Sequence, residues 1–140
     1  MTTARMILAA LGVVFSTGAA CALEAVTVTP LYEMTETASG KPITLPQNNV
    51  RVIVSTFDIA PGARLPVHKH PFARYGIVQA GTLKVTNVET NEDKVYKAGD
   101  FIVEMIGQWH RAENVGDNAV KLLVIDQVEG AAANTILKDQ

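Results

Sequence analysis

The segment Gly62-Ala63-Arg64-Leu65-Pro66-Val67-His68-Lys69-His70 places two histidines one residue apart. Successive side chains of a β-strand point to opposite faces, so side chains at positions i and i+2 share a face. If the segment is extended, the imidazoles of His68 and His70 therefore project together. Neutral imidazole is the commonest metal ligand in proteins. The segment predicts one side of a metal site carried by a β-strand.

The chain has one further histidine, His110, in a segment that begins at Gly99 and ends at Asn114. A ligand this distant serves the same ion only if the fold brings the two segments together. We take His68, His70 and His110 as the candidate metal ligands. Three imidazoles suit one divalent ion of Fe, Zn, Cu, Ni or Mn, and the order of affinities does not choose among them.

Apolar residues recur with a period of two, which indicates β-strands rather than helices. Strands are expected at residues 50–59, 82–87, 101–105 and 119–126, separated by short turn signals rich in Gly, Asn and Asp. Residues 50–59 are apolar on both faces, so this strand is expected to be covered on two sides. Residues 131–140 are expected to be helical or frayed, without a function. The pattern predicts an all-β sandwich or barrel.

The composition describes a small folded domain. The 140 residues are 48% hydrophobic and 19% charged, which favours a packed core over disorder. The formal net charge of −2 gives no basic surface for nucleic acid or anionic lipid. We therefore expect a small-molecule partner and no nucleic-acid partner.

Residues 1–22 have the pattern of a secretory signal peptide. A singly positive start precedes an apolar run at residues 6–15, and Ala20-Cys21-Ala22 has the small residues of a cleavage site before Leu23. The run is shorter than the roughly 20 residues of a spanning helix, so no membrane span is expected after cleavage. The mature protein is then a single domain at residues 23–140, periplasmic or secreted. Lipid modification of Cys21 is the alternative, which Gly18, three residues earlier, disfavours.

The histidine segments resemble the two motifs of a small single-domain cupin of type 2. Four residues, Gly62, His68, His70 and Gly81, stand at the spacing of Gly-x5-His-x-His-x(3,4)-Glu-x6-Gly. Three more, Gly99, His110 and Asn114, fit Gly-x5-Pro-x4-His-x3-Asn. The resemblance covers roughly residues 45–128. It implies a double-stranded β-helix, or jelly-roll barrel, of six to ten strands with the histidines inside.

Two positions of this chain depart from the cupin motifs. Arg74, or Tyr75 with the longer spacing, stands where the family carries its metal-binding glutamate, which reduces the implied ligand set to three histidines. Glu104 stands where the family usually carries an inward apolar residue, and Met105 replaces the proline. A buried carboxylate needs a partner, and the candidates are Arg74 and the metal. We expect an inward Arg74–Glu104 ion pair, with metal binding by Glu104 as the competing outcome.

Further side chains near the motifs are candidates for substrate binding. Arg74 offers a planar fork for a carboxylate, although it can equally be a solvated surface charge. Trp109 can stack on a ligand or simply pack in the wall. The full candidate set is Arg74, Tyr75, Glu104, Gln108 and Trp109.

The resemblance leaves the activity open, because one fold supports many functions. The first hypothesis is an exported mononuclear metal enzyme, oxygenase-like, that acts on a small anionic molecule, since three protein ligands leave open positions on the ion. The alternatives are a non-catalytic module that binds a metal or small ligand, and a structural barrel without metal. The resemblance also implies a homodimer paired through sheet edges, with residues 27–45 crossing to the partner.

Overall fold

The structure is a computed structural model that describes residues 26–138. The predicted signal peptide, residues 1–22, therefore lies outside the described residues. Residues 26–30 are exposed and have no regular structure, and the β domain extends from Leu31 onward. Among the described residues there is no helix of the length and apolar character needed to cross a membrane.

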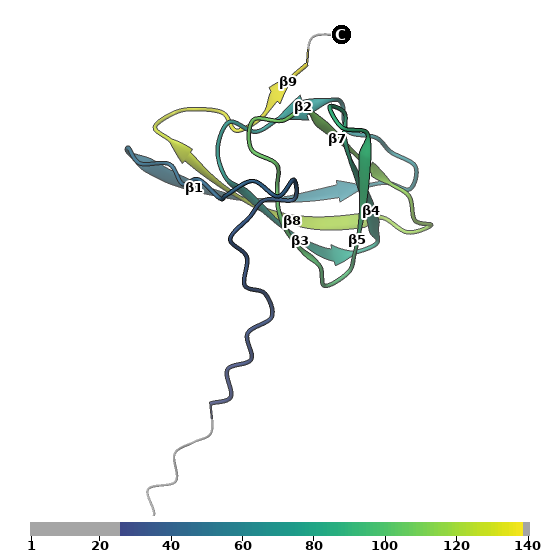
Figure 1. Ribbon diagram of the computed structural model, residues 1–140. Helices are drawn as coiled ribbons and strands as arrows, with labels where there is room; N and C mark the ends of the chain where they lie inside the picture. The colour runs from purple at the N-terminus through teal and green to yellow at the C-terminus, as the bar shows by residue number, and fades with distance from the viewer. Residues whose placement is uncertain (1–25, 139–140) are drawn as a thin grey trace, which may run out of the picture. The chain divides into compact units, whose positions relative to one another are not determined.

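The described residues form nine strands and no helix, which confirms the predicted all-β class (Figure 1). The strands are β1 (Val50–Ile59), β2 (His68–Lys69), β3 (Arg74–Ala80), β4 (Thr82–Asn87), β5 (Glu92–Lys97), β6 (Phe101–Val103), β7 (His110–Asn114), β8 (Val120–Glu129) and β9 (Ile136–Leu137).

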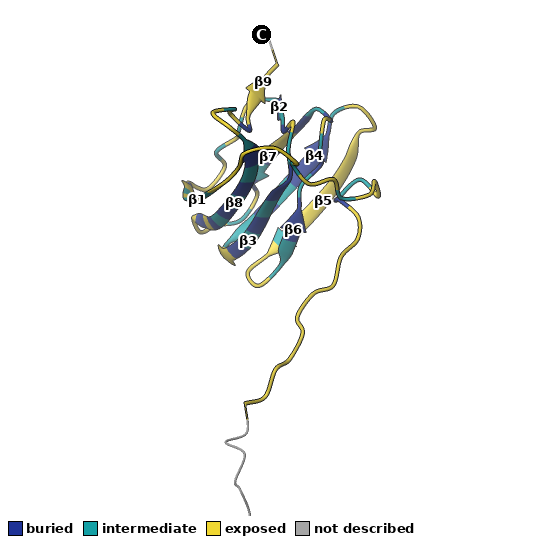
Figure 2. Ribbon diagram, turned by 90° about the vertical axis from the view of Figure 1, so that its left-hand side faces the viewer, coloured by how far each residue is buried: buried dark blue, intermediate teal, exposed yellow. Residues whose placement is uncertain are grey.

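Two antiparallel sheets make up the domain, in the orders β1-β8-β3-β6 and β5-β4-β7-β2-β9. Their facing sides bury a common apolar core that includes Val78 and Val124 from the first sheet and Leu83 and Ala112 from the second. Side chains alternate between this core and the outside, as the dark and light bands along β8 and β3 show in Figure 2. The core and the inward histidines thus share the space between the sheets.

The turn between β3 and β4 requires glycine at position 81. Gly81 has a φ of +81°, and a Cβ there would lie 2.8 Å from the carbonyl oxygen of Ala119 and the Cα of Val120. Residues other than glycine rarely adopt this φ, and the backbone of the neighbouring turn leaves no room. Gly81 is therefore required where the chain passes from β3 in one sheet to β4 in the other.

Strand β1 corrects the expectation of a strand covered on both faces. Within residues 26–138 it lies at the edge of its sheet and pairs only with β8. Its outward valines Val50, Val52 and Val54 are 50%, 57% and 61% exposed, whereas Ile59 at its end is buried. The two-sided apolar pattern was misleading because the described chain places no element over the outer face of β1.

The C-terminal residues also differ from expectation, because they are neither helical nor frayed up to Lys138. Strand β9 pairs with β2, with Leu137 opposite His68 and Ile136 opposite Lys69. In the segment before β1, Tyr32 donates a hydrogen bond to the carbonyl oxygen of Gly99. The crossing of residues 27–45 to a partner subunit stays a prediction. Strand β9 belongs to the sheet that contains His68 and His110.

Candidate metal centre

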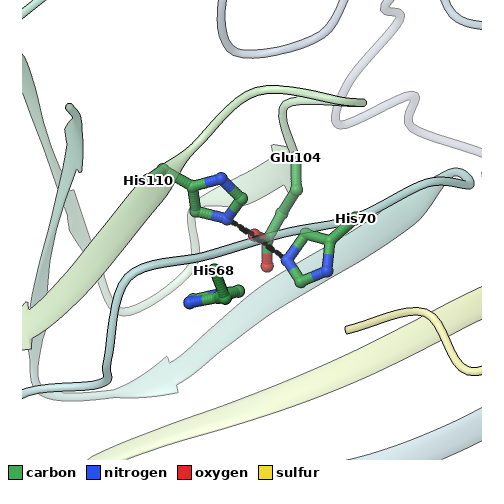
Figure 3. Close-up of side chains that lie close together, drawn as sticks. All are labelled: His68, His70, Glu104 and His110. Carbon is green, nitrogen blue, oxygen red and sulfur yellow. Dashed lines mark hydrogen bonds and ion pairs between the residues drawn. The ribbon is translucent and has the colours of Figure 1, made fainter. Parts of the chain in front are cut away.

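Strand pairing brings the three histidines together inside the domain. His68 opens β2 and lies opposite His110, the first residue of β7, while His70 follows β2 directly. The exposed fractions of His68, His70 and His110 are 5%, 0% and 1%. With Glu104, they offer four ligand atoms that all lie within 4.8 Å of one another, as Figure 3 shows. The two histidine segments therefore converge as expected. Metal binding by these residues stays a prediction.

Backbone carbonyl groups fix which ring nitrogen of each histidine faces the centre. The Nδ1 atoms of His68 and His110 lie 2.7 and 2.9 Å from the carbonyl oxygens of Pro66 and Gln108. The Nδ1 of His70 lies 2.5 Å from the carbonyl oxygen of Asn134. A carbonyl oxygen only accepts hydrogen bonds, so each Nδ1–H must donate. Each Nε2 is left with its lone pair for a metal, the usual arrangement of metal-binding histidine.

Glu104, directly after β6, supplies a carboxylate to the same centre. Its Oε2 lies 3.2 Å from the Nε2 of His70 and 3.3 Å from the Nε2 of His110 (Figure 3). Burial favours the neutral acid, but the adjacent His110 and His70 outweigh burial and hold the pKa of Glu104 well below 4.5. Glu104 is therefore a carboxylate at neutral pH and adds an oxygen donor to the three histidines.

Arg74 does not pair with Glu104, so the expected ion pair between them is wrong. Its Nε and Nη2 donate to the two carboxylate oxygens of Asp126 at 2.7 and 3.0 Å. This bidentate pair forms because Arg74 and Asp126 are register partners on β3 and β8. The competing outcome, Glu104 among the histidines, is the one observed, although Arg74 is buried and does not face solvent.

The donor set fits a divalent metal ion. Tetrahedral coordination with bonds of about 2.0–2.1 Å places ligand atoms roughly 3.3 Å apart. Three of the separations at this site are 3.2–3.3 Å, counting the 3.2 Å between the Nε2 atoms of His70 and His110. Three lone pairs and a carboxylate oxygen face one another, and they are acceptors that a cation would satisfy together.

Two pockets border the candidate ligand atoms. An interior cavity of about 20 Å³ touches His68, Glu104, His110 and Arg74 and is otherwise walled by apolar side chains. This is room for about one water molecule. A larger pocket of about 240 Å³ shares four lining residues with the cavity: Phe57, Leu65, His68 and Arg74. Pro66, Thr135 and Leu137 complete its lining, so this pocket borders the centre on the side of β9.

The remaining substrate-binding candidates lie elsewhere. Tyr75 is on the outer face of β3, where it stacks on Phe101 and donates to Gln127. Trp109 lies under the ammonium group of Lys69 at 4.5 Å. The buried side-chain oxygen of Gln108 has no hydrogen-bond partner among the described residues. Neither pocket is lined by Tyr75, Gln108 or Trp109.

Three polar residues near the centre were not singled out from the sequence: Asp126, Asn134 and Thr135. Asp126 and Asn134 are 6% and 5% exposed, and Thr135 accepts a hydrogen bond from Arg74 at 3.1 Å. A single aspartate in the apolar run of residues 119–126 is a signal that could have identified Asp126. Asn134 and Thr135 carry no such signal, because the C-terminal residues have no clear periodicity.

Comparison with known proteins identifies a family for this domain. The family model described as Cupin domain matches residues 55–126, just over half of the chain. Germin-like protein subfamily 1 member 7 of Arabidopsis thaliana is 41% identical over 81 residues, which cover 52% of this chain and 35% of that protein. The chain thus aligns with about a third of the length of this curated relative.

Solved structures share the fold. An uncharacterized conserved protein with a double-stranded β-helix domain from Klebsiella pneumoniae is 25% identical, with a TM-score of 0.50, over 71% of this chain and 83% of that chain. An oxalate decarboxylase of Bacillus subtilis, with Mn(II) centres, is 22% identical, with a TM-score of 0.50, over 64% and 24% of the two chains. These matches confirm the predicted double-stranded β-helix.

Proposed function

The chain belongs to the cupin family, and from this premise we propose that it is an exported metal-dependent enzyme, oxygenase-like, that acts on a small molecule. The observation that carries the proposal is the group formed by His68, His70, Glu104 and His110. All four side chains direct electron-pair donors to one point inside the domain. Such a cluster of buried acceptors is costly without a cation to satisfy it.

The ligand set supports a divalent ion. Imidazole suits Fe, Zn, Cu and Ni, and a carboxylate adds the oxygen donor that suits Mn. His68, His70, Glu104 and His110 would hold the ion, and the bound ion would supply Lewis-acid chemistry to a substrate beside them. The interior beside these atoms is largely apolar, which strengthens any electrostatic interaction there.

Arg74 is the residue best placed to orient a substrate. Its Nη1 lies 3.5 Å from the Nε2 of His70, while its Nε and Nη2 are held by Asp126. Nη1 donates to Nε2 of His70 in this structure; once a metal ion takes that lone pair, the Nη1 hydrogens would be available to an anionic or carbonyl oxygen beside the ligand atoms. Because Asp126 already compensates the charge of Arg74, the site favours a small molecule with one such oxygen and an apolar body that fits the outer pocket.

Oxygen uptake tests the proposed activity. The metal-loaded protein is supplied with a panel of small carboxylates, thiols and diketones, and dioxygen consumption is recorded. We expect uptake with at least one compound, and we expect it to be lost in His110→Ala but kept in Glu113→Gln, a surface variant of the same strand. Absence of uptake across the panel while metal is bound would contradict the oxygenase-like activity.

A non-catalytic module is the second candidate, and the size of the interior cavity favours it. About 20 Å³ next to the ligand atoms admits roughly one water-sized group. A protein that holds an ion or a very small ligand needs no more space than this. Binding of metal without turnover of any compound in the panel would select this function over the enzyme.

We also propose that the protein is exported, with residues 1–22 removed, and is periplasmic or secreted. The support is the charge, apolar run and small-residue pattern of the sequence. Intact-mass analysis of the protein from its native host should give a chain that starts at Leu23 or within a few residues of it. A chain that retains Met1 would contradict export by cleavage, and a lipid adduct on Cys21 would select the anchored form.

The exposed strand β1 supports a homodimer. Its outward valines are apolar, and as an edge strand it has unpaired backbone groups on one side. A second copy could pair its own β1 antiparallel across a two-fold axis, which would satisfy these backbone groups and place the outward valines of the two copies side by side. Light scattering at micromolar concentration should report a dimer, and Val52→Lys should shift it toward monomer. A wild-type protein that is monomeric under these conditions would contradict the dimer.

A further inference from the structure

The segment of residues 131–138 lies outside the part of the chain that matches the family model, yet it contacts the metal centre. Strand β9 pairs with β2, and the amide of Lys138 donates to the carbonyl oxygen of Val67 at 2.9 Å. Thr135 and Leu137 line the outer pocket. In Figure 1, β9 runs beside β2 at the end of the domain that carries the histidines. Residues 131–138 thus contact the rest of the domain next to the histidines.

The three histidines differ in what orients them. His68 and His110 each donate to the carbonyl group two residues earlier in their own segment. His70 instead donates to the carbonyl oxygen of Asn134, 64 residues later in the chain. The orientation of His70 is therefore the one that depends on the C-terminal segment.

The side chain of Asn134 holds that carbonyl group in place. Asn134 is 5% exposed; its Oδ1 accepts from the amide of Phe72 at 2.9 Å, and its Nδ2 donates to Asp126 at 2.6 Å. Asp126 in turn binds Arg74, whose Nη2 also donates to Thr135 in the same segment. One buried asparagine thus links the segment to both His70 and the Arg74–Asp126 pair.

We propose that Asn134 is a positioning residue of the metal centre, which fixes the ring of His70 with Nε2 toward the ion and so makes metal affinity depend on residues 131–138. The inference rests on the proposed metal binding at His68, His70, Glu104 and His110. Because the hydrogen-bond partners of ligating histidines orient the ring, their loss typically lowers metal affinity roughly 10–100-fold.

The test compares Asn134→Ala with Ile136→Ala in the full chain. Ile136 lies in the same segment, and its side chain is 43% exposed. The dissociation constant of Zn²⁺ is measured by competition with a chromophoric chelator, and the His70 tautomer is read from imidazole ¹⁵N chemical shifts of the metal-free protein. In Asn134→Ala we expect affinity lower by roughly 10–100-fold and a loss of the pure Nδ1–H form of His70. Ile136→Ala should match the wild type in both.

Three results would count against the proposal or its premise. Unchanged affinity and an unchanged tautomer in Asn134→Ala would overturn the role of Asn134 while leaving the metal site intact. An equal loss of affinity in Ile136→Ala would overturn it too, because the effect would then be general to the segment. A wild-type protein that does not bind Zn²⁺ or any other divalent ion would overturn the proposed function, while the tautomer comparison still decides what Asn134 does. If Asn134→Ala does not fold, Asn134→Ser is judged by the same readouts.

Discussion

Arg74, or Tyr75 with the longer spacing, stands at the glutamate position of the first cupin motif, and Glu104 supplies a carboxylate from another segment. Asp126 connects these two departures from the cupin motifs. Because Asp126 pairs with Arg74, Glu104 is not paired with Arg74 and faces the histidines. At the residue scale, the carboxylate of this site comes from the second motif segment rather than from the first. The remaining donor group of Arg74, Nη1, lies 3.5 Å from Nε2 of His70.

The Arg74–Asp126 pair gives a prediction about stability. Arg74→Ala leaves Asp126 as a buried carboxylate without its ionic partner, and breaking such a pair costs about 3–5 kcal/mol. Denaturant unfolding of the metal-free protein measures this cost. Arg64→Ala is the matched control, because Arg64 is 73% exposed in its pair with Glu113, and exposed pairs contribute under about 1 kcal/mol. Equal effects of the two variants would show that Arg74 and Asp126 do not form a buried pair.

His68 gives a prediction about pH. Burial lowers its pKa from 6.5 to about 4, although its hydrogen bond to Pro66 opposes the shift. Between these two values unfolded His68 is protonated while folded His68 is neutral, so the unfolded state binds more protons. The metal-free protein should therefore lose stability as the pH falls from 6.5 through about 4.

Urea unfolding at a series of pH values measures this loss, and His68→Gln should reduce the slope between the two pKa values. A metal-free wild-type protein whose unfolding free energy stays constant over the whole interval would contradict the pKa shift. Glu104 acts in the same direction at lower pH, because its own pKa is also depressed.

At the scale of elements, the strands were predictable where a period of two met a clear turn. Residues 50–59 form a strand with the expected bounds, and the alternation in residues 82–87 appears as buried and half-buried positions of β4 up to Val85, whereas Thr86 is buried as well. The common face of His68 and His70 followed from strand geometry alone. What escaped prediction depends on tertiary pairing: the exposure of β1, the strand β9, and the contact of Asn134 with His70 across 64 residues.

The turn between β3 and β4 allows a matched test of two motif glycines. Gly81 and Gly62 both have positive φ, +81° and +73°, but a Cβ would clash with backbone only at Gly81. A residue other than glycine in this region costs about 1–3 kcal/mol. Gly62→Ala should lose roughly this amount, and Gly81→Ala should lose clearly more because Ala119 and Val120 must shift. Thermal unfolding decides, and equal losses would contradict the close approach at Gly81.

At the scale of the whole molecule, two sheets share one interior in which an apolar core and a polar centre lie side by side. Seven motif positions identified this family from the sequence, because their spacing reflects strands that must meet around a common point. The ligand of the outer pocket was not predictable in the same way, because the lining of this pocket comes from segments that only the fold brings together.

Metal content is the measurement that tests the central claim most directly. Protein purified without chelators or an affinity metal should contain close to one divalent ion per chain by elemental analysis. His110→Ala and Glu104→Gln should each lose most of it, since both remove an atom of the ligand group, whereas Glu113→Gln should keep it. A wild-type protein free of metal that also binds none when Mn, Fe, Ni, Cu and Zn are supplied would contradict the account, as would full metal content in His110→Ala.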